Sequence, residues 1–213
     1  MLICGRRMER LQEIKNEYPQ VEIKECDVAI AADREALFGW VANAFPEVNM
    51  LINNAGMQLH TNLTQPVDVK QIALETETNF VAPIHLASLF AQHFSSKPEA
   101  AIMNVSSGLA FAPLAFMPVY CATKAAIHSF TLSLRHQLKD TSVKVFEIIP
   151  PSVDTELGHH NREDKSQSHG GMPVAEFVAA ALKGMEKDEY EIAVGQAIGL
   201  RAKREELFTM MNR

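Results

Sequence analysis

Residues 104–124 read NVSSGLAFAPLAFMPVYCATK, and they decide the fold class because they join a strand pattern to a helix pattern. The apolar run that ends in this stretch, residues 100–105, is typical of a buried strand, and residues 119–138 follow with helical period. Serines come directly after the strand, and Tyr120 and Lys124 open the helix. Polar side chains at the carboxyl end of a strand are typical of the ligand edge of an open α/β sheet. This stretch therefore predicts a strand–loop–helix unit that carries a site.

The same alternation of strand and helix patterns runs along the whole chain. The runs that we expect to form strands are residues 1–4, 21–26, 48–52, 100–105, 143–148 and 191–194. The stretches of helical period are residues 7–17, 33–44, 69–94, 119–138, 174–187 and 200–211. Alternation of this kind predicts an α/β protein with a mostly parallel sheet and helices on both faces. Residues 155–172 break the pattern and are expected to form a mobile surface loop.

Length and composition narrow the class of protein. The chain has 213 residues, which suits one domain, and 47% of them are apolar. A net charge of −6 without a basic run argues against a nucleic-acid partner. No apolar stretch reaches the roughly 20 residues of a membrane helix, and the N-terminus lacks a signal-peptide pattern. The three scattered cysteines fit a reducing compartment, so we expect a soluble cytoplasmic protein.

Ser107, Tyr120 and Lys124 form the pattern that indicates chemistry. Residues four apart share a helix face, so the tyrosine and the lysine point the same way. A phenol with a pKa near ~10 exchanges protons poorly at neutral pH, and a nearby ammonium favours its ionised form. The serine hydroxyl can hold a substrate oxygen beside the phenol. A Tyr-x-x-x-Lys pair alone is common on helix surfaces, but the combination predicts proton transfer to a carbonyl that receives a hydride.

On these residues the chain resembles the classical short-chain dehydrogenase/reductase family. The resemblance rests also on NNAG at residues 53–56, Asn79 within ETNFVAPIHL, and PPSVDT at residues 150–155. EIAVGQAIGLR and FTMMN near the C-terminus resemble the oxidoreductase subgroup of the lipoteichoic-acid D-alanylation operon. The resemblance implies one Rossmann-like, doubly wound domain over residues 1–213, in which residues 155–172 are the substrate loop.

The resemblance also implies roles for individual residues. Tyr120 would be the general acid/base, Lys124 would lower its pKa and bind the nicotinamide ribose, Ser107 would orient the substrate carbonyl, and Asn79 would hold a water of the proton relay. The implied cofactor contacts are Arg6, Asp27, Val28, Asn54, Ala55, Gly56, Tyr120, Lys124, Pro150, Val153 and Thr155. The implied apolar wall beside the substrate is Phe111, Leu114, Phe116 and Met117.

NADP(H) is favoured over NAD(H) as the cofactor. NAD-specific relatives usually end the second strand of the family's sheet with an acidic residue that binds the ribose 2′-hydroxyl. Here that strand is followed by Arg6 and Arg7, whose guanidinium groups suit a 2′-phosphate. The alternative is that the arginines only begin a solvated helix.

Pro151 departs from the family's pattern, because the family generally has glycine there and proline lacks a backbone N–H.

The glycine-rich phosphate turn and the first strand of the family have no counterpart in this sequence. That strand lies centrally in the family's sheet, so we expect residues 1–4 and 21–26 to lack a neighbour joining them to residues 48–52. We therefore expect a truncated or mis-started chain that is unstable and inactive alone. Three functions stay open: an oxidoreductase acting on a small carbonyl or alcohol, an impaired or silent dinucleotide-fold protein, and a fragment complemented by another chain.

Assembly and the remaining candidate residues complete the expectations. The helices at residues 69–94 and 119–138 are apolar on more than one face, which predicts a homodimer or tetramer. Cys121 is expected to be a packing residue. Three histidines lie in a polar loop without the spacing of a metal site, so no metal is expected; they are His159, His160 and His169.

Overall fold

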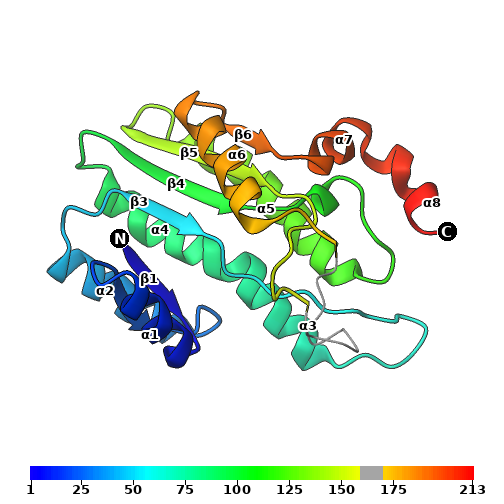
Figure 1. Ribbon diagram of the computed structural model, residues 1–213, viewed down its shortest axis with the longest axis horizontal. Helices are drawn as coiled ribbons and strands as arrows, with labels where there is room; N and C mark the ends of the chain where they lie inside the picture. Colours follow the sequence, from blue (N-terminus) through cyan, green and yellow to red (C-terminus); the bar gives the residue numbers. More distant parts are fainter. Residues whose placement is uncertain (159–169) are drawn as a thin grey trace.

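The computed structural model describes residues 1–158 and 170–213 and is a mixed α/β structure (Figure 1). Its strands are β1 (Leu2–Gly5), β2 (Glu22–Glu25), β3 (Met50–Asn53), β4 (Ala100–Val105), β5 (Val143–Ile149) and β6 (Glu191–Ala193). Its α-helices are α1 (Met8–Glu17), α2 (Ala31–Ala44), α3 (Val69–Thr76), α4 (Ala82–Phe94), α5 (Pro118–Gln137), α6 (Val174–Glu186), α7 (Gln196–Lys203) and α8 (Phe208–Met211). Every predicted strand is present, with ends that differ by a few residues, and the predicted helical stretches are present except that residues 69–94 and 200–211 are each divided into more than one element.

All strand pairs are parallel, and they form two sheets. One sheet is β1–β2, and the other has the order β3–β4–β5–β6. Leu2 pairs with Glu22 in the first sheet, and Met50 pairs with Ala101 in the second. No ladder joins β1 or β2 to β3 among the described residues, which confirms the predicted separation. The side chain of Ile52 on β3 is accordingly about half exposed.

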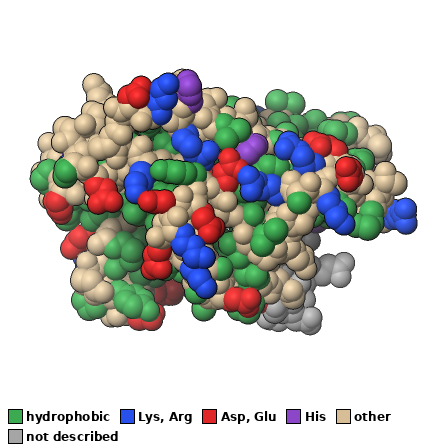
Figure 2. Space-filling model, turned by 90° about the horizontal axis from the view of Figure 1, so that it is seen from above, with side chains coloured by type: hydrophobic (Ala, Val, Ile, Leu, Met, Phe, Trp, Pro, Cys, Tyr) green, Lys and Arg blue, Asp and Glu red, His purple; other side chains and the backbone are tan. Residues whose placement is uncertain are grey.

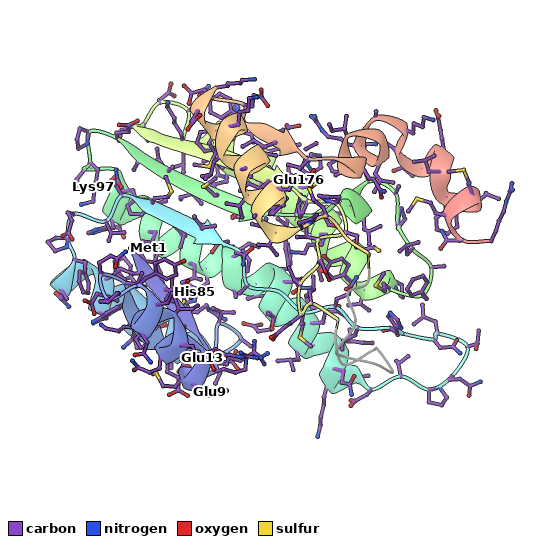
Figure 3. All side chains as sticks on the ribbon, in the orientation of Figure 1. Met1, Glu9, Glu13, His85, Lys97 and Glu176 are labelled. Carbon is purple, nitrogen blue, oxygen red and sulfur yellow. The ribbon has the colours of Figure 1, made fainter. Side chains whose placement is uncertain are left out.

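Side chains connect the two sheets where backbone ladders do not. Arg34 of α2 is buried, donates from Nε to Nδ1 of His85 at 3.0 Å, and pairs with Glu77 at 2.9 Å. Figure 3 labels His85 on α4, on the side of the β1–β2 sheet. One apolar cluster also contains residues of both units, including Leu37 of α2 and Phe90 of α4. Both units therefore contribute to the same core.

The four-stranded sheet is covered on both faces. Ile102 of β4 faces the cluster that contains residues of α4 and α5, whereas Met103 faces the cluster of α6. Successive strand residues point to opposite faces, so this alternation follows from the pleat. Figure 1 shows α6 on one face of the sheet and α4 with α5 on the other. The loops at the carboxyl ends of these strands then face the same edge.

The predicted helix over residues 69–94 contains a π-helical segment, η1 (Glu77–Val81), between α3 and α4. The N–H of Ala82 donates to the carbonyl of Glu77, five residues earlier. Pro83 follows one residue later, lacks an N–H, and would clash with the carbonyl of Asn79 in a regular α-helix. The wider turn relieves that clash, and it places Asn79 in the irregular part of the helix.

The predicted helix over residues 200–211 is wrong in its bounds. Helix α7 begins at Gln196 and ends at Lys203, and the 3-10 turn η4 (Arg204–Leu207) separates it from α8. Arg204 has φ +52°, a left-handed conformation that ends the α-helix. Helical period alone does not reveal such a break.

The surface carries charges of both signs over the face seen in Figure 2, where Lys, Arg, Asp and Glu side chains are interspersed. Within the described parts, no helix is long and apolar enough to cross a membrane. In those same parts, no three His, Cys, Asp or Glu side chains are grouped to hold a metal ion. All three cysteines are free, and Cys121 is buried as predicted. His159, His160 and His169, and most of the loop expected at residues 155–172, lie outside the described residues.

Candidate active site

The structure brings the four predicted catalytic side chains to the carboxyl edge of the four-stranded sheet. Ser107 follows β4, Tyr120 and Lys124 lie in the first turns of α5, and Asn79 lies in η1. All four are buried, with at most 6% of each residue exposed. A Cβ atom placed on Gly56 would lie 3.4 Å from Oδ1 of Asn79 and 3.7 Å from Nζ of Lys124. These are ordinary van der Waals distances, so the NNAG turn lies beside two of these side chains.

Lys124 connects α5 to β4. Its Nζ donates to the carbonyl of Val105 at 2.9 Å and lies 5.7 Å from the centre of the Tyr120 ring. Desolvation by burial lowers the pKa of Lys124 to about 8. Burial disfavours the charged form of a lysine, so this direction follows from its surroundings. The group still carries its proton through most of the neutral range.

Burial dominates the pKa of Tyr120 as well. The pKa of Tyr120 is raised to about 12: desolvation by burial is the largest cause, a hydrogen bond with Ser107 lowers the pKa by less, and Cys121 and Glu75 add to the rise. The sequence predicted the opposite direction, a pKa lowered by Lys124. The difference arises because the free-energy cost of taking the phenolate out of water exceeds the stabilisation that neighbouring groups give the phenolate here. In this structure Tyr120 is a phenol with its proton in place.

The side-chain amide of Asn79 forms hydrogen bonds with the backbone of Met57, the residue that follows the NNAG turn. Its Oδ1 accepts the N–H of Met57 at 2.8 Å, and its Nδ2 donates to the carbonyl of Met57 at 2.8 Å. The same Nδ2 lies 3.2 Å from Oγ1 of Thr123, one residue before the lysine. Asn79 thus joins η1, the NNAG turn and α5 at one point.

Arg6 and Asp27 lie at a second place, beside the carboxyl ends of β1 and β2. They line a hollow of about 460 Å³ together with Lys24, Glu25, Ile30, Asp33 and Ala36. Arg6 is exposed, and the described residues give it no ion-pair partner, whereas Arg7 pairs with Glu156 at 2.8 Å. A free guanidinium suits a phosphate group, and a carboxylate suits an amino group of an adenine ring. The hollow therefore offers groups that could hold the adenosine end of a nicotinamide cofactor.

The other residues implied to contact the cofactor lie in the segments that follow the carboxyl ends of β2, β3 and β5. Asn54, Ala55 and Gly56 are exposed in the turn after β3. The carbonyl of Val28 accepts a hydrogen bond from Arg34, and that of Pro150 accepts the N–H of Gly108 at 3.0 Å. Val153 forms a parallel bridge with Met172, and Oγ1 of Thr155 accepts the N–H of Leu157 at 3.2 Å.

The implied apolar wall is divided between core and surface. Phe111 is 1% exposed and packs with Ile149 and Ala197, so it belongs to the core. Met117 packs with Tyr120, and Leu114 lies beside them. The side chain of Phe116 is about half exposed. Leu114 and Met117 are therefore the members of that set that border the tyrosine.

Several residues near the site were missed from the sequence. Glu147 is fully buried in β5, where Ser106 Oγ donates to it at 2.5 Å and Nδ1 of His128 lies 2.7 Å away. A single acid inside the apolar run VFEII was an available signal for it. Glu75 is also fully buried, one turn before Asn79. Asn212 of the last turn binds residues 113–115, and neither Glu75 nor Asn212 carries a local sequence signal.

Comparison with known proteins agrees with this fold and site. Residues 1–166 match the short chain dehydrogenase family. The chain therefore belongs to the short-chain dehydrogenase family of oxidoreductases, and the resemblance predicted from its motifs is confirmed.

Individual relatives narrow the similarity further. The chain is 45% identical to the uncharacterized oxidoreductase DltE of Bacillus subtilis (strain 168) over 217 residues, which cover 100% of this chain and 86% of that protein. A short-chain dehydrogenase from Sphingobium yanoikuyae in complex with NADPH matches with TM-score 0.80 and 27% identity, over 90% of this chain and 76% of that one. The closed form of serine dehydrogenase complexed with NADP+ matches with TM-score 0.80 and 26% identity, over 91% of this chain and 83% of that one.

Proposed function

We propose that this oxidoreductase interconverts a small carbonyl compound and its alcohol with NADP(H), through Ser107, Tyr120, Lys124 and Asn79. The observation that carries the proposal is the convergence of these four buried side chains at one sheet edge. Tyr120 carries its proton at neutral pH, as a proton donor to a carbonyl oxygen must, and the nearby ammonium of Lys124 favours release of that proton. A silent dinucleotide-binding protein, the alternative, has no chemical need for this arrangement.

Each side chain has a defined task in the proposed reduction. When bound, the nicotinamide group supplies the hydride that reaches the carbonyl carbon. Ser107 holds the carbonyl oxygen beside Tyr120, whose O–H gives its proton to that oxygen. The ammonium of Lys124 opposes the negative charge left on the phenolate oxygen. Asn79 holds a water of the proton relay, through which solvent returns a proton to the phenolate oxygen of Tyr120.

NADP(H) is proposed over NAD(H) because of Arg6, which directly follows β1. Arg6 lines the hollow and has no ion-pair partner among the described residues. A guanidinium group recognises a phosphate through charge-assisted hydrogen bonds. The two structural relatives described as bound to NADPH and NADP+ support the same choice.

We also propose that the chain is one domain, acts in the cytoplasm, and pairs with a second copy. An apolar groove of about 350 Å³ between η1 and α5 supports the pairing; it is lined by Leu63, Thr76, Phe80, Pro118, Val119, Ala122, Thr123 and Ala126. Ala122 is exposed in this groove. Light scattering should give a dimer or tetramer for the parent and a smaller mass for Ala122→Glu. A monomeric parent at micromolar concentration would refute the pairing.

The reaction itself is tested by NADPH oxidation against a panel of small ketones and aldehydes. In a version that also carries the family's first strand and glycine-rich turn, which is the parent of the activity variants, turnover should appear with at least one compound. Tyr120→Phe should lower it by ~100-fold or more, the lower range for general acid–base catalysis. Tyr18→Phe is the matched control, because Tyr18 is exposed and remote from the site. Cofactor binding without turnover of any compound would favour the silent alternative.

A further inference from the structure

Glu75 is a buried acid that the proposed mechanism does not use. It lies on α3 with no exposed surface. Its Oε1 accepts the N–H of Leu59 at 3.0 Å, whereas its Oε2 is buried and has no hydrogen-bond partner in the described structure. A buried carboxyl oxygen without a partner is costly, so packing alone does not account for this residue.

Glu75 and Asn79 hold the same short segment of backbone. Asn79 makes two hydrogen bonds to Met57, and Glu75 makes one to Leu59, two residues further along. The two side chains lie four residues apart on the continuous α3–η1 helix, with the π-helical segment beginning between them. Together they fix residues 57–59, which continue directly from the turn that packs against Lys124.

We propose that Glu75 is a positioning residue of the Tyr120 site, which fixes residues 57–59 together with Asn79 and does so as a neutral carboxylic acid. The proposal rests on the proposed carbonyl reduction, because its effect on turnover passes through Tyr120 and Lys124. A neutral acid keeps one oxygen as the acceptor for Leu59 and carries an O–H on the other.

The surroundings of Glu75 favour the neutral form. Burial raises the pKa of Glu75, and the hydrogen bond from Leu59 lowers it by less. The titratable groups that feel its charge are Tyr120 and Cys121 of α5, and ionised Glu75 would raise the pKa of both. A carboxylate here would therefore oppose formation of the Tyr120 phenolate, whereas the neutral acid does not.

Three variants separate positioning from simple packing. Glu75→Gln keeps an acceptor for Leu59, Glu75→Leu removes it at similar size, and Gln71→Leu is an exposed control one turn earlier on α3. In Glu75→Leu, hydrogen exchange in a peptide covering residues 54–62 should speed up, and kcat with NADPH should fall by ~10-fold or more because the site is misplaced. Glu75→Gln should keep slow exchange and a kcat within about threefold of the parent, since its amide oxygen keeps the hydrogen bond. Gln71→Leu should match the parent in both.

The pH dependence tests the protonation state. If Glu75 is neutral, Glu75→Gln leaves the pH profile of kcat unchanged around neutral pH. A profile shifted to lower pH in Glu75→Gln would show that a negative charge had been removed, and it would overturn the neutral form. Unchanged exchange and kcat in Glu75→Leu would overturn the positioning role. Hydrogen exchange needs no substrate. It therefore tests whether Glu75 fixes residues 57–59 even if the parent reduces no carbonyl compound. Should Glu75→Leu fail to fold, the exchange and profile of Glu75→Gln decide.

Discussion

Nζ of Lys124 donates its hydrogen bond to the carbonyl of Val105 while lying 5.7 Å from the ring centre of Tyr120. The lysine therefore ties α5 to the end of the strand that delivers Ser107. Because it is buried with the tyrosine, desolvation lowers the pKa of the lysine to about 8 and raises that of the tyrosine to about 12. Both groups hold their protons at neutral pH, so the site begins the reduction fully protonated.

Lys124 should make the stability of the protein depend on alkaline pH. Its pKa is about 8 in the folded state and 10.5 as the unperturbed value, so the unfolded chain binds more protons between these pH values. Stability then rises with pH across that window, because the buried charge that opposes folding below pH 8 is lost first in the folded state. The full gain is ~3 kcal/mol at about 1.4 kcal/mol per pKa unit.

Urea unfolding at pH 7.5 and pH 10 tests this for the parent and Lys124→Met. Relative to the variant, the parent should gain ~2 kcal/mol between these values, since the variant has no group that titrates there. Lys139→Met, which removes an exposed lysine two residues after α5, should follow the parent. A difference between parent and Lys124→Met that stays constant with pH would contradict the lowered pKa.

Features that depend on the local hydropathy pattern could be predicted from the sequence, whereas features that depend on packing and burial could not. Strand β4 was predicted with its observed ends, because AAIMNV is apolar apart from Asn104 and polar serines follow it. The π-helical segment was missed, although Pro83 inside the helical stretch was an available signal, because helical period alone does not show how a helix accommodates a proline. Spacing and resemblance together predicted that Ser107, Tyr120, Lys124 and Asn79 lie close together, and their catalytic roles stay a prediction. The direction of the Tyr120 pKa was not, because it depends on how deeply the fold buries the phenol.

Glu147 and His128 should support the site as a coupled pair. His128→Leu leaves a fully buried carboxyl group with Ser106 as its remaining partner. Leaving such a group partly unsatisfied costs ~1–3 kcal/mol, so the free energy of unfolding should fall by that amount. Glu147→Leu should also be costly, because it removes the nearer acceptor of the Ser106 hydroxyl and leaves only the carbonyl of Ile148 at 3.4 Å.

The double variant separates coupling from simple loss of packing. Combining His128→Leu with Glu147→Leu removes both ends of the contact, so its cost should be less than the sum of the single costs by ~1 kcal/mol. Urea unfolding of the four proteins gives the interaction energy. Strictly additive costs would show that the 2.7 Å contact contributes nothing to stability.

Arg6 should set the preference for NADPH, whereas Arg7 should not. Arg6 lines the hollow without an ion-pair partner among the described residues, but Arg7 is engaged with Glu156. Arg6→Ala should narrow the free-energy gap between NADPH and NADH binding by ~1.5–3 kcal/mol, the range for a hydrogen bond to a charged group. Isothermal titration of the parent, Arg6→Ala and Arg7→Ala with both cofactors makes the comparison. Equal affinities in the parent, or a larger effect from Arg7→Ala, would contradict the assignment.

Asn212 should control how well substrate binds, because it fastens the C-terminus to the segment between Ser107 and Tyr120. Its Oδ1 accepts the N–H of Ala115 at 2.6 Å, and its Nδ2 donates to the carbonyl of Pro113 at 3.1 Å. Asn212→Ala releases that segment beside Leu114, so KM should rise while kcat changes little, since none of the reacting groups moves. The loss of stability should be only ~1 kcal/mol, because Ala115 is exposed and water can replace the lost bond. Steady-state kinetics against the neighbouring exposed control Arg213→Ala measures the difference, and a lowered kcat with unchanged KM would instead place Asn212 in support of the catalytic groups.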